Sequence, residues 1–456
     1  MLLVVKFINL KRIDARSLIV YRNVIESIFL KGAGVVIGFL TVTLTVQYIS
    51  VKDFGIWMTI TFLTSWFSLV DVSFGNGLRN SLVLFFDTGD HEQAKKYVST
   101  LYFLSGAFAL VLCVIFGAIH FFLDWTTLLN IDSDQPALIN TIITYTLISF
   151  SLQLLLKPIT SILLANQRAA AVAWILLIVN TAVIALIYFA SIFLNESLLV
   201  IAHIYNLVPV LVFGGASVYF FRTDYTRLAP GLSYIDVSLI RKLVTISGQF
   251  FFLQLVSIIV FTSGGLFISY YLGSDSVAPY SIANKYFSVL PFIYGIFITP
   301  YWSAFTDAYI KQDIVWIQST IRRLNLICAS MAGLALLMLA VAQPLFSLWI
   351  GSKIQIPTSL SGWLTAYVIS FIFLSNYNYF INGVGQIKKL VQTSLIGIVL
   401  YFPFNYVLFH FTDAGPASVV IAGTLWNCFL LVVCISQYRQ IMNSLSHKTE
   451  NYALQD

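Results

Sequence analysis

The sequence has too few charges for a protein that folds in water. Only 10% of its 456 residues are Asp, Glu, Lys or Arg, whereas 59% are hydrophobic. A soluble domain has about 25% charged and about 45–50% apolar residues, and its polar side chains cover the surface. The mean hydropathy of +0.88 therefore predicts a chain surrounded by lipid. It excludes a cytoplasmic enzyme, a secreted domain and a disordered chain.

Motifs for nucleotide, metal and redox chemistry are also missing. The sequence has no Gly-x-x-x-x-Gly-Lys-Ser/Thr loop to hold ATP phosphates, and His91-Glu92-Gln93 lacks the second histidine of a zinc motif. The four cysteines lie in apolar runs without a Cys-x-x-Cys pair, so we interpret them as packing residues. No cofactor and no metal site is predicted, and the chain is not expected to be an enzyme.

What the sequence does contain is a series of long apolar runs. A helix needs about 20 mostly apolar residues to cross a bilayer, and β-barrel strands would be shorter and alternating. The predicted spans are 24–50, 55–72, 98–122, 137–165, 169–193, 197–221, 243–272, 277–305, 324–349, 358–384, 389–411 and 414–438. We therefore predict an all-α integral membrane protein with twelve transmembrane helices.

The basic residues predict the orientation of these spans. With a cytoplasmic N-terminus, 20 of the 25 Lys and Arg residues lie in cytoplasmic segments, and only Lys52 and Lys353 lie in outer loops. Cytoplasmic loops of membrane proteins carry such an excess of positive charge. The net charge of +6 is explained in this way, so no nucleic-acid partner is expected. Both termini are predicted to be cytoplasmic.

The two halves of the chain share features that are 219 residues apart. Arg22 precedes the first span and Arg241 the seventh, while Gln167 ends the fourth span and Gln386 the tenth. Each half has an even number of spans, so both start on the same side, as in transporters with a substrate site between parallel repeats. We predict two pseudo-symmetric six-helix bundles around a central cavity. The predicted domains are an amphipathic cytoplasmic segment at 1–23, an N-terminal six-helix bundle at 24–221, a cytoplasmic linker at 222–242, a C-terminal six-helix bundle at 243–438 and a cytoplasmic tail at 439–456.

Three lysines lie inside the predicted spans. They are Lys31 in the first span, Lys157 in the fourth and Lys285 in the eighth. An ionised side chain that faces the bilayer centre costs roughly 2.5–3.5 kcal/mol, so these lysines are expected to face protein or water. Lys31 and Lys157 could instead reach the inner interface, whereas Lys285 is too deep to do so easily. We predict a cationic cavity that binds an anion such as a diphosphate.

The carboxylates inside the spans are fewer and lie nearer the inner surface. Glu26 precedes Lys31 by five residues, and Asp71 closes the second span. Both are candidates for ion coupling, with an ion pair between Glu26 and Lys31, or a cap formed by Asp71, as structural alternatives. His203 in the sixth span is either a proton relay or a packed neutral histidine.

Three short stretches resemble polysaccharide-export flippases. Residues 277–285 (VAPYSIANK) resemble the family's vG-x-Y-s-i-A-x-(R/K) stretch, with Pro279 where glycine is usual. Residues 53–57 (DFGIW) are similar to the opening of the family's second helix, and 71–77 (DVSFGNG) to the end of that helix. With the span count, these stretches make the chain similar to Wzx-type O-antigen or capsule flippases of the multidrug/oligosaccharidyl-lipid/polysaccharide exporter superfamily.

The resemblance implies a V-shaped pair of six-helix bundles that works by alternating access. Its cargo would be an undecaprenyl-diphosphate-linked oligosaccharide, moved from the cytoplasmic to the periplasmic leaflet of a bacterial inner membrane and driven by protons or sodium. The expected partners are this lipid-linked oligosaccharide, the coupling ion, membrane lipid and other membrane proteins of glycan assembly. Lys31, Lys157 and Lys285 match the family's cavity cations.

Two other functions fit an apolar chain of this length. A small-molecule exporter of the multidrug branch has the same span count, but that branch favours anionic cavities. A membrane-embedded glycosyltransferase or polymerase is a third hypothesis, and it requires a long outer loop that the sequence lacks.

Overall fold

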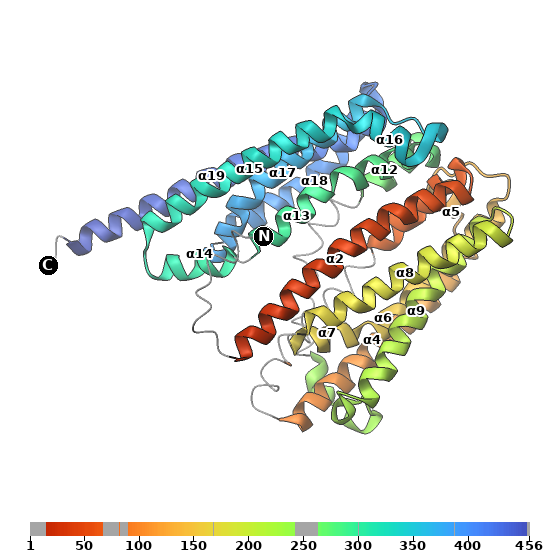
Figure 1. The fold of residues 1–456 in the computed structure, drawn as a ribbon, viewed down its shortest axis with the longest axis horizontal. Coiled ribbons are helices and arrows are strands. Elements are labelled where there is room, and N and C mark those ends of the chain that lie inside the picture. Colours follow the sequence, from red (N-terminus) through yellow and green to blue (C-terminus); the bar gives the residue numbers. More distant parts are fainter. Residues whose placement is uncertain are drawn as a thin grey trace. The chain divides into compact units, whose positions relative to one another are not determined.

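The computed structural model describes residues 15–66, 82, 90–166, 168–241, 263–299, 301–386 and 388–453. In these ranges the chain forms α-helices joined by turns and short 3-10 helices, without a β-strand (Figure 1). Ten helices among them are long and apolar enough to cross a membrane. The chain is therefore an all-α, multi-pass membrane protein. The predicted spans 55–72 and 243–272 extend beyond the described residues, so the count of twelve stays a prediction.

Several helix bounds agree closely with the hydropathy of the sequence. Helix α8 covers Ala169–Phe193 and α17 covers Thr358–Val384, the same bounds as two of the predicted spans. The spacing of 219 residues also recurs in the structure, because α7 ends at Ala165 and α17 at Val384. Likewise, α8 begins at Ala169 and α18 at Lys388. These matched ends support the predicted internal repeat.

The helices pack into two compact units. The first consists of Met1–Ile49, Phe67–Asp124 and Ala137–Gln254, and the second of Ser50–Trp66, Trp125–Pro136 and Leu255–Asp456. This division differs from the predicted bundles at 24–221 and 243–438. Two segments that the prediction placed in the N-terminal bundle, Ser50–Trp66 and Trp125–Pro136, pack with the second unit.

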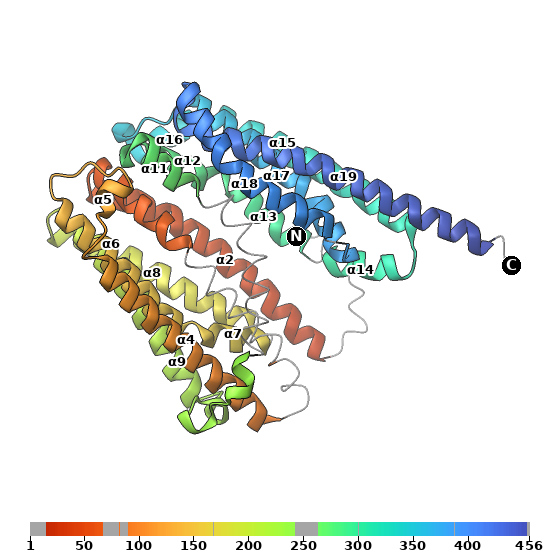
Figure 2. The same ribbon diagram turned by 180° about the vertical axis from the view of Figure 1, so that it is seen from behind.

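In the first unit, α2 lies along α8, as both ribbon views show (Figures 1 and 2). The described helices of the first unit are α2 (Ala15–Tyr48), α4 (His91–Ile119), α6 (Pro136–Leu156), α7 (Pro158–Ala165), α8 (Ala169–Phe193) and α9 (Leu198–Arg222). Apolar residues of α4, α7 and α9 form a buried cluster around Leu101, Ile162 and Phe213. Because lipid surrounds membrane-spanning helices, these surfaces hold the unit together by close packing rather than by removing apolar area from water.

The predicted linker after α9 folds back onto α4 of the same unit. Two 3-10 helices, Thr226–Leu228 and Leu232–Tyr234, lie within it. The contacts with α4 are Gly231 N to Ser99 Oγ at 3.1 Å, Asp236 N to Thr100 Oγ1 at 3.0 Å, and the Lys95 ammonium 4.1 Å from the centre of the Tyr234 ring. Arg168 and Asp224 form an ion pair at its start. The described part of the linker is thus an ordered element of the first unit.

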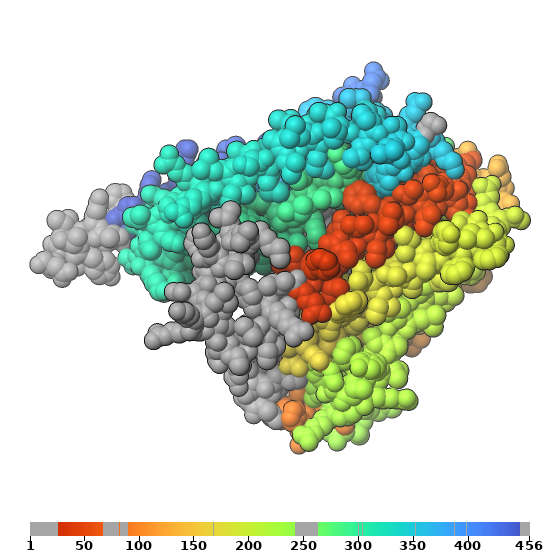
Figure 3. All heavy atoms as spheres, in the orientation of Figure 1, coloured from red at the N-terminus to blue at the C-terminus, as the bar shows by residue number. Residues whose placement is uncertain are grey.

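In the second unit, α17 is the central helix and packs against α12, α13, α14, α15 and α19. The described α-helices are residues 51–66, α5 (Trp125–Leu128), α11 (Gly264–Leu272), α12 (Val277–Phe287), α13 (Val289–Ile298), α14 (Tyr301–Ile310), α15 (Ile314–Ala340), α16 (Ala342–Ile350), α17 (Thr358–Val384), α18 (Lys388–Phe411) and α19 (Ser418–Ala453). Figure 3 shows α15 on the surface of this unit. Its exposed Leu326, Leu336 and Leu337 are typical of a face that contacts lipid.

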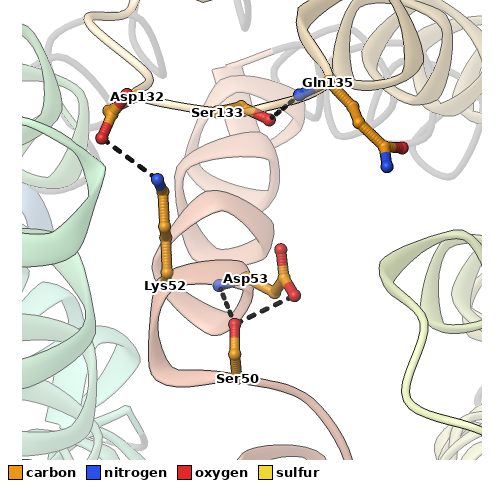
Figure 4. Close-up of polar contacts among 6 residues, drawn as sticks. All are labelled: Ser50, Lys52, Asp53, Asp132, Ser133 and Gln135. Atoms are coloured by element: carbon orange, nitrogen blue, oxygen red, sulfur yellow. Dashed lines mark hydrogen bonds and ion pairs between the residues drawn. The ribbon is translucent and has the colours of Figure 1, made fainter.

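A cap at Ser50 starts the helix at 51–66. The Ser50 hydroxyl accepts the Asp53 backbone N–H at 3.0 Å and donates to the Asp53 carboxylate at 2.9 Å (Figure 4). This pairing resembles a capping box, which satisfies otherwise unpaired N–H groups at a helix start. Lys52 beside it forms an ion pair with Asp132 at 3.1 Å. Ser50 is therefore the capping residue, and the family-like aspartate of 53–57 accepts a hydrogen bond from its hydroxyl.

The helix at 51–66 joins the second unit through a glycine. A Cβ atom at Gly55 would lie 2.3 Å from the Ser274 carbonyl oxygen, so only glycine permits this approach. The rings of Phe62 and Tyr280 lie 5.9 Å apart in the same interface. Two of the family-like stretches, 53–57 and 277–285, thus lie on elements that pack against each other.

Candidate functional site

Lys285 lies in the last turn of α12, just before that helix is interrupted. Pro291 has no N–H with which to bind the carbonyl of Phe287, so the predicted eighth span breaks between α12 and α13. Ser288 closes the break: its N–H donates to the Asn284 carbonyl at 2.9 Å, and its hydroxyl donates to the Lys285 carbonyl at 2.9 Å. The lysine therefore stands at the C-terminal end of a helix, where a positive charge is favoured by the helix dipole.

The Lys285 side chain is half-buried. Its ammonium group forms no hydrogen bond or ion pair with any residue that the structure describes. The neighbouring Tyr286 is buried and donates its hydroxyl to the Met338 carbonyl at 3.1 Å. Tyr280 is buried as well, with its hydroxyl facing Gly264. These two tyrosines are used in packing, whereas the lysine has no carboxylate partner among the described residues.

Lys157 occupies a similar backbone position in the first unit. It forms the turn between α6 and α7, because the following Pro158 interrupts the helix as the sequence predicts. The half-buried ammonium group lies 5.3 Å from the ring centre of Phe150 and 5.9 Å from that of Phe213. Such cation–π contacts contribute on the order of 0.5–1 kcal/mol or more. The ammonium group of Lys157 thus contacts aromatic rings of the first unit, to which Lys157 itself belongs.

Lys31 and Glu26 do not form the ion pair that was one alternative for them. Five residues on a helix turn the side chains about 140° apart around the axis. Glu26 instead accepts a hydrogen bond from Trp174 Nε1 of α8 at 2.9 Å. Lys31 is exposed and has no hydrogen-bonding or charged partner among the described side chains. Asp71 lies outside the described residues. The role of Glu26 and Asp71 in ion coupling stays a prediction.

The structure places Lys31 and Lys157 in the first unit and Lys285 in the second. Their joint use in one cavity stays a prediction. His203 lies on α9 with Nδ1 3.3 Å from the Tyr145 hydroxyl of α6, so it has a polar partner in its own unit. No group of three metal-ligating side chains occurs in the described ranges.

One polar cluster was missed by reading the sequence for charges alone. Asn376 is fully buried on α17, where it accepts a hydrogen bond from the Tyr294 hydroxyl and donates to Asn325 Oδ1 at 3.1 Å. Asn325 in turn donates to the Tyr377 hydroxyl at 3.0 Å. The signal for this cluster was available, because asparagines inside apolar spans need hydrogen-bond partners. Asn376 also stands 219 residues after Lys157.

Comparison with known proteins identifies the family. The family model described as polysaccharide biosynthesis protein matches residues 20–305. The chain belongs to this family. The search of curated protein sequences finds no match. This member of the polysaccharide biosynthesis family can still be compared with solved structures.

The solved structures show the fold that the family member adopts. It matches an inward-facing multidrug resistance MATE family transporter of the MOP superfamily with a TM-score of 0.76 at 14% identity, over 90% of this chain and 94% of that one. It matches the lipid II flippase MurJ, in an inward closed conformation, with a TM-score of 0.68 at 14% identity over 92% and 90%. A superfamily transporter from Pyrococcus furiosus, described by the reverse polarity of its binding pocket, gives 0.53 at 14% over 93% and 94%.

These matches confirm the predicted resemblance to polysaccharide-transporter-type flippases of this superfamily. The chain is thus a multi-pass membrane protein of the polysaccharide biosynthesis family, and it has the fold of these transporters.

Proposed function

We propose that this protein is a flippase for undecaprenyl-diphosphate-linked oligosaccharide repeat units. It would move them from the cytoplasmic to the periplasmic leaflet of a bacterial inner membrane by ion-coupled alternating access. The observation that carries the proposal is Lys285, an unpaired cation among the described residues, inside a span of a polysaccharide biosynthesis family member. The fold shared with the lipid II flippase MurJ supports a lipid-linked cargo.

The chemistry of the three lysines fits a diphosphate head group. At an effective dielectric near 20, a lysine about 4 Å from one phosphate charge gains about 4 kcal/mol. That gain offsets part of the cost of removing a diphosphate from water. Lys285 and Lys31 have no carboxylate partner among the described residues, so their charge is free to act on a ligand. The polyprenyl tail would remain in lipid while Lys31, Lys157 and Lys285 contact the head group.

The decisive test replaces Lys285 in cells. In a deletion strain, we expect wild-type protein to restore surface glycan and Lys285→Ala to restore at least about tenfold less, because one charge-assisted contact is worth roughly 1.5–3 kcal/mol. Single repeat units should accumulate on the lipid carrier, measured by mass spectrometry. Lys285→Arg keeps the charge and should restore part of the activity.

The matched control is Lys311→Ala, because Lys311 is exposed and paired with Asp307 at 2.7 Å. Immunoblots of the membrane fraction establish that each variant is present in equal amount. Full surface glycan with Lys285→Ala would contradict the assignment of this lysine to the substrate.

A multidrug exporter is the second candidate, and the match to the MATE transporter favours it at the level of fold. Export of organic cations calls for a carboxylate facing the cargo. Within the predicted spans, the lysines Lys31 and Lys285 instead have no partner among the described residues. Unchanged drug susceptibility of the deletion strain, together with accumulated lipid-linked repeat units, would distinguish the flippase from the exporter.

A further inference from the structure

The second unit contains a surface pocket with a partly polar lining, and none of the predicted site residues lines it. It has a volume of about 440 Å³ and lies between α15, α17 and α19. Its polar lining consists of Gln318, Arg322, Asn325, Tyr377, Tyr438 and Arg439. The lining has two cations and no carboxylate. A pocket of this composition is complementary to an anion.

The two arginines of the pocket lack counter-ions. Neither Arg322 nor Arg439 forms an ion pair with a residue that the structure describes. Two other cations of the same unit are paired, Lys311 with Asp307 at 2.7 Å and Lys52 with Asp132 at 3.1 Å. The pocket therefore concentrates positive charge that the unit itself leaves uncompensated.

The wall of the pocket is held in place by the buried amide cluster. Asn376 is fixed by the buried Tyr294 hydroxyl and donates to Asn325, which donates to the Tyr377 hydroxyl at 3.0 Å. Because the Tyr377 oxygen accepts this bond, its own O–H hydrogen remains to be donated to another acceptor. The Tyr438 ring packs 5.6 Å from the Tyr377 ring. These contacts hold the Tyr377 donor at the pocket before any ligand arrives.

The arginines lie where the sequence predicts the inner membrane surface. Arg322 lies two residues before the predicted ninth span, 324–349, and Arg439 directly follows the predicted twelfth, 414–438. Lipid phosphates lie at this depth, and a guanidinium group binds phosphate oxygens with two parallel hydrogen bonds. Tyr377 and the amide of Gln318 can supply further donors from the pocket lining.

We propose that this pocket binds a phosphate or diphosphate head group at the cytoplasmic surface. The site is separate from the three lysines, since none of them lines it. It would be a docking position at which a head group is held before or beside transport. That this head group belongs to the carried lipid rests on the proposed function, whereas the pocket itself requires only phosphate chemistry.

Calorimetric titration of the purified full-length protein in non-ionic detergent tests the proposal. The probes are inorganic diphosphate, farnesyl diphosphate and phosphatidylglycerol. We expect the wild-type protein to bind at least one of them, and Arg322→Gln and Arg439→Gln each to weaken that binding about tenfold. Tyr377→Phe keeps the ring but removes the hydroxyl, and it should weaken binding about threefold to tenfold.

Arg323→Gln is the matched control, because Arg323 is exposed like its neighbour Arg322 but does not line the pocket. The affinity of the Arg323→Gln variant for the probe should stay within about twofold of wild type. Equal losses in Arg322→Gln and Arg323→Gln would show a diffuse effect of surface charge and overturn the proposal, as would the absence of binding for all three probes. Circular dichroism of each variant establishes that the helices are retained.

The three probes also distinguish the sources of the phosphate. Binding of the two diphosphates but not of phosphatidylglycerol supports the carried lipid as ligand, and binding of phosphatidylglycerol alone supports a membrane phospholipid. Because this assay measures no transport, it is independent of the cell experiment on Lys285. Pocket binding without accumulation of repeat units in the deletion strain would leave the pocket standing and refute the flippase function.

Discussion

Gly55 and Ser274 touch through their backbones, although they are far apart in the sequence. A Cβ atom at Gly55 would lie 2.3 Å from the Ser274 carbonyl oxygen and 3.1 Å from its carbonyl carbon. Both atoms belong to the backbone, so no side-chain rotation can relieve the overlap. This contact ties the helix at 51–66 to the segment that leads into α12, the helix that carries Lys285.

Replacing this glycine should therefore damage the second unit. We expect Gly55→Ala to destabilise the purified protein by roughly 1–3 kcal/mol, because overpacking forces backbone shifts. The measurement is the apparent Tm in detergent by intrinsic fluorescence. Gly333→Ala is the control, since a Cβ at Gly333 on α15 meets nothing within 4 Å. That variant should be neutral or slightly stabilising, because alanine favours helix more than glycine does. An unchanged Tm for Gly55→Ala would contradict the close contact.

The buried amide of Asn376 should be more important to stability than its lack of charge suggests. Asn376→Leu leaves the Tyr294 hydroxyl and Asn325 Oδ1 without the partners described above. We expect a loss of about 1–3 kcal/mol for each buried group left unsatisfied. Adding Tyr294→Phe to Asn376→Leu should cost less than it does in the wild-type background, a coupling that a double-mutant cycle measures. Purely additive losses would contradict a shared hydrogen-bond cluster. Asn382→Leu, near the end of α17, is the comparison.

The aromatic contacts of Lys157 predict a coupling that depends on charge. The ammonium group lies over Phe150 and Phe213 at 5.3 and 5.9 Å. We expect Phe150→Leu to lower stability by roughly 0.5–1 kcal/mol more in the wild-type background than in Lys157→Met, because methionine has no charge to interact with the ring. Chemical unfolding of the four proteins in detergent provides the comparison. The same loss in both backgrounds would mean that only packing is affected.

The linker of the first unit should loosen in acid. The Asp236 carboxylate accepts hydrogen bonds from the Ser238 hydroxyl at 2.6 Å and the Ser238 N–H at 2.9 Å, which lower its pKa below the usual 3.8. A lowered pKa in the folded state means that this contribution is present above pH 3.8 and is lost as the pH falls through the folded value.

Hydrogen exchange, corrected for the intrinsic pH dependence of the chemistry, should show falling protection of the Ser238 amide below pH 3.8. Asp236→Asn should make that protection insensitive to pH in this range. A wild-type linker with constant protection down to pH 2 would contradict the role of the carboxylate.

The membrane helices could be predicted because hydropathy is a local property. Any apolar run of sufficient length must satisfy its own backbone hydrogen bonds in lipid, and a helix does so without help from other segments. The bounds of α8 and α17 agree with the apolar runs for this reason, and Pro158 predicts its helix break because the missing N–H belongs to the residue itself.

The candidate site was predictable only in part. Lysines inside apolar runs stand out in a sequence, so Lys31, Lys157 and Lys285 could be proposed from composition and depth alone, and their role in binding stays a prediction. The pocket of Arg322 and Arg439 was not found, since each arginine at a span end is explained by the ordinary excess of basic residues in cytoplasmic loops. Their significance comes from α15, α17 and α19 lying together.

By itself, the sequence determined the class of this protein: apolar length made it a multi-pass helical membrane protein, and short motifs pointed to its family. The tertiary structure decided which residues contact one another. Ser50–Trp66 packs with the second unit, and Glu26 accepts a hydrogen bond from Trp174 instead of pairing with Lys31. The amide of Asn376 donates to Asn325 in the pocket wall. The physical reason is that a helix forms from interactions within about four residues, whereas these contacts join residues brought together only by packing.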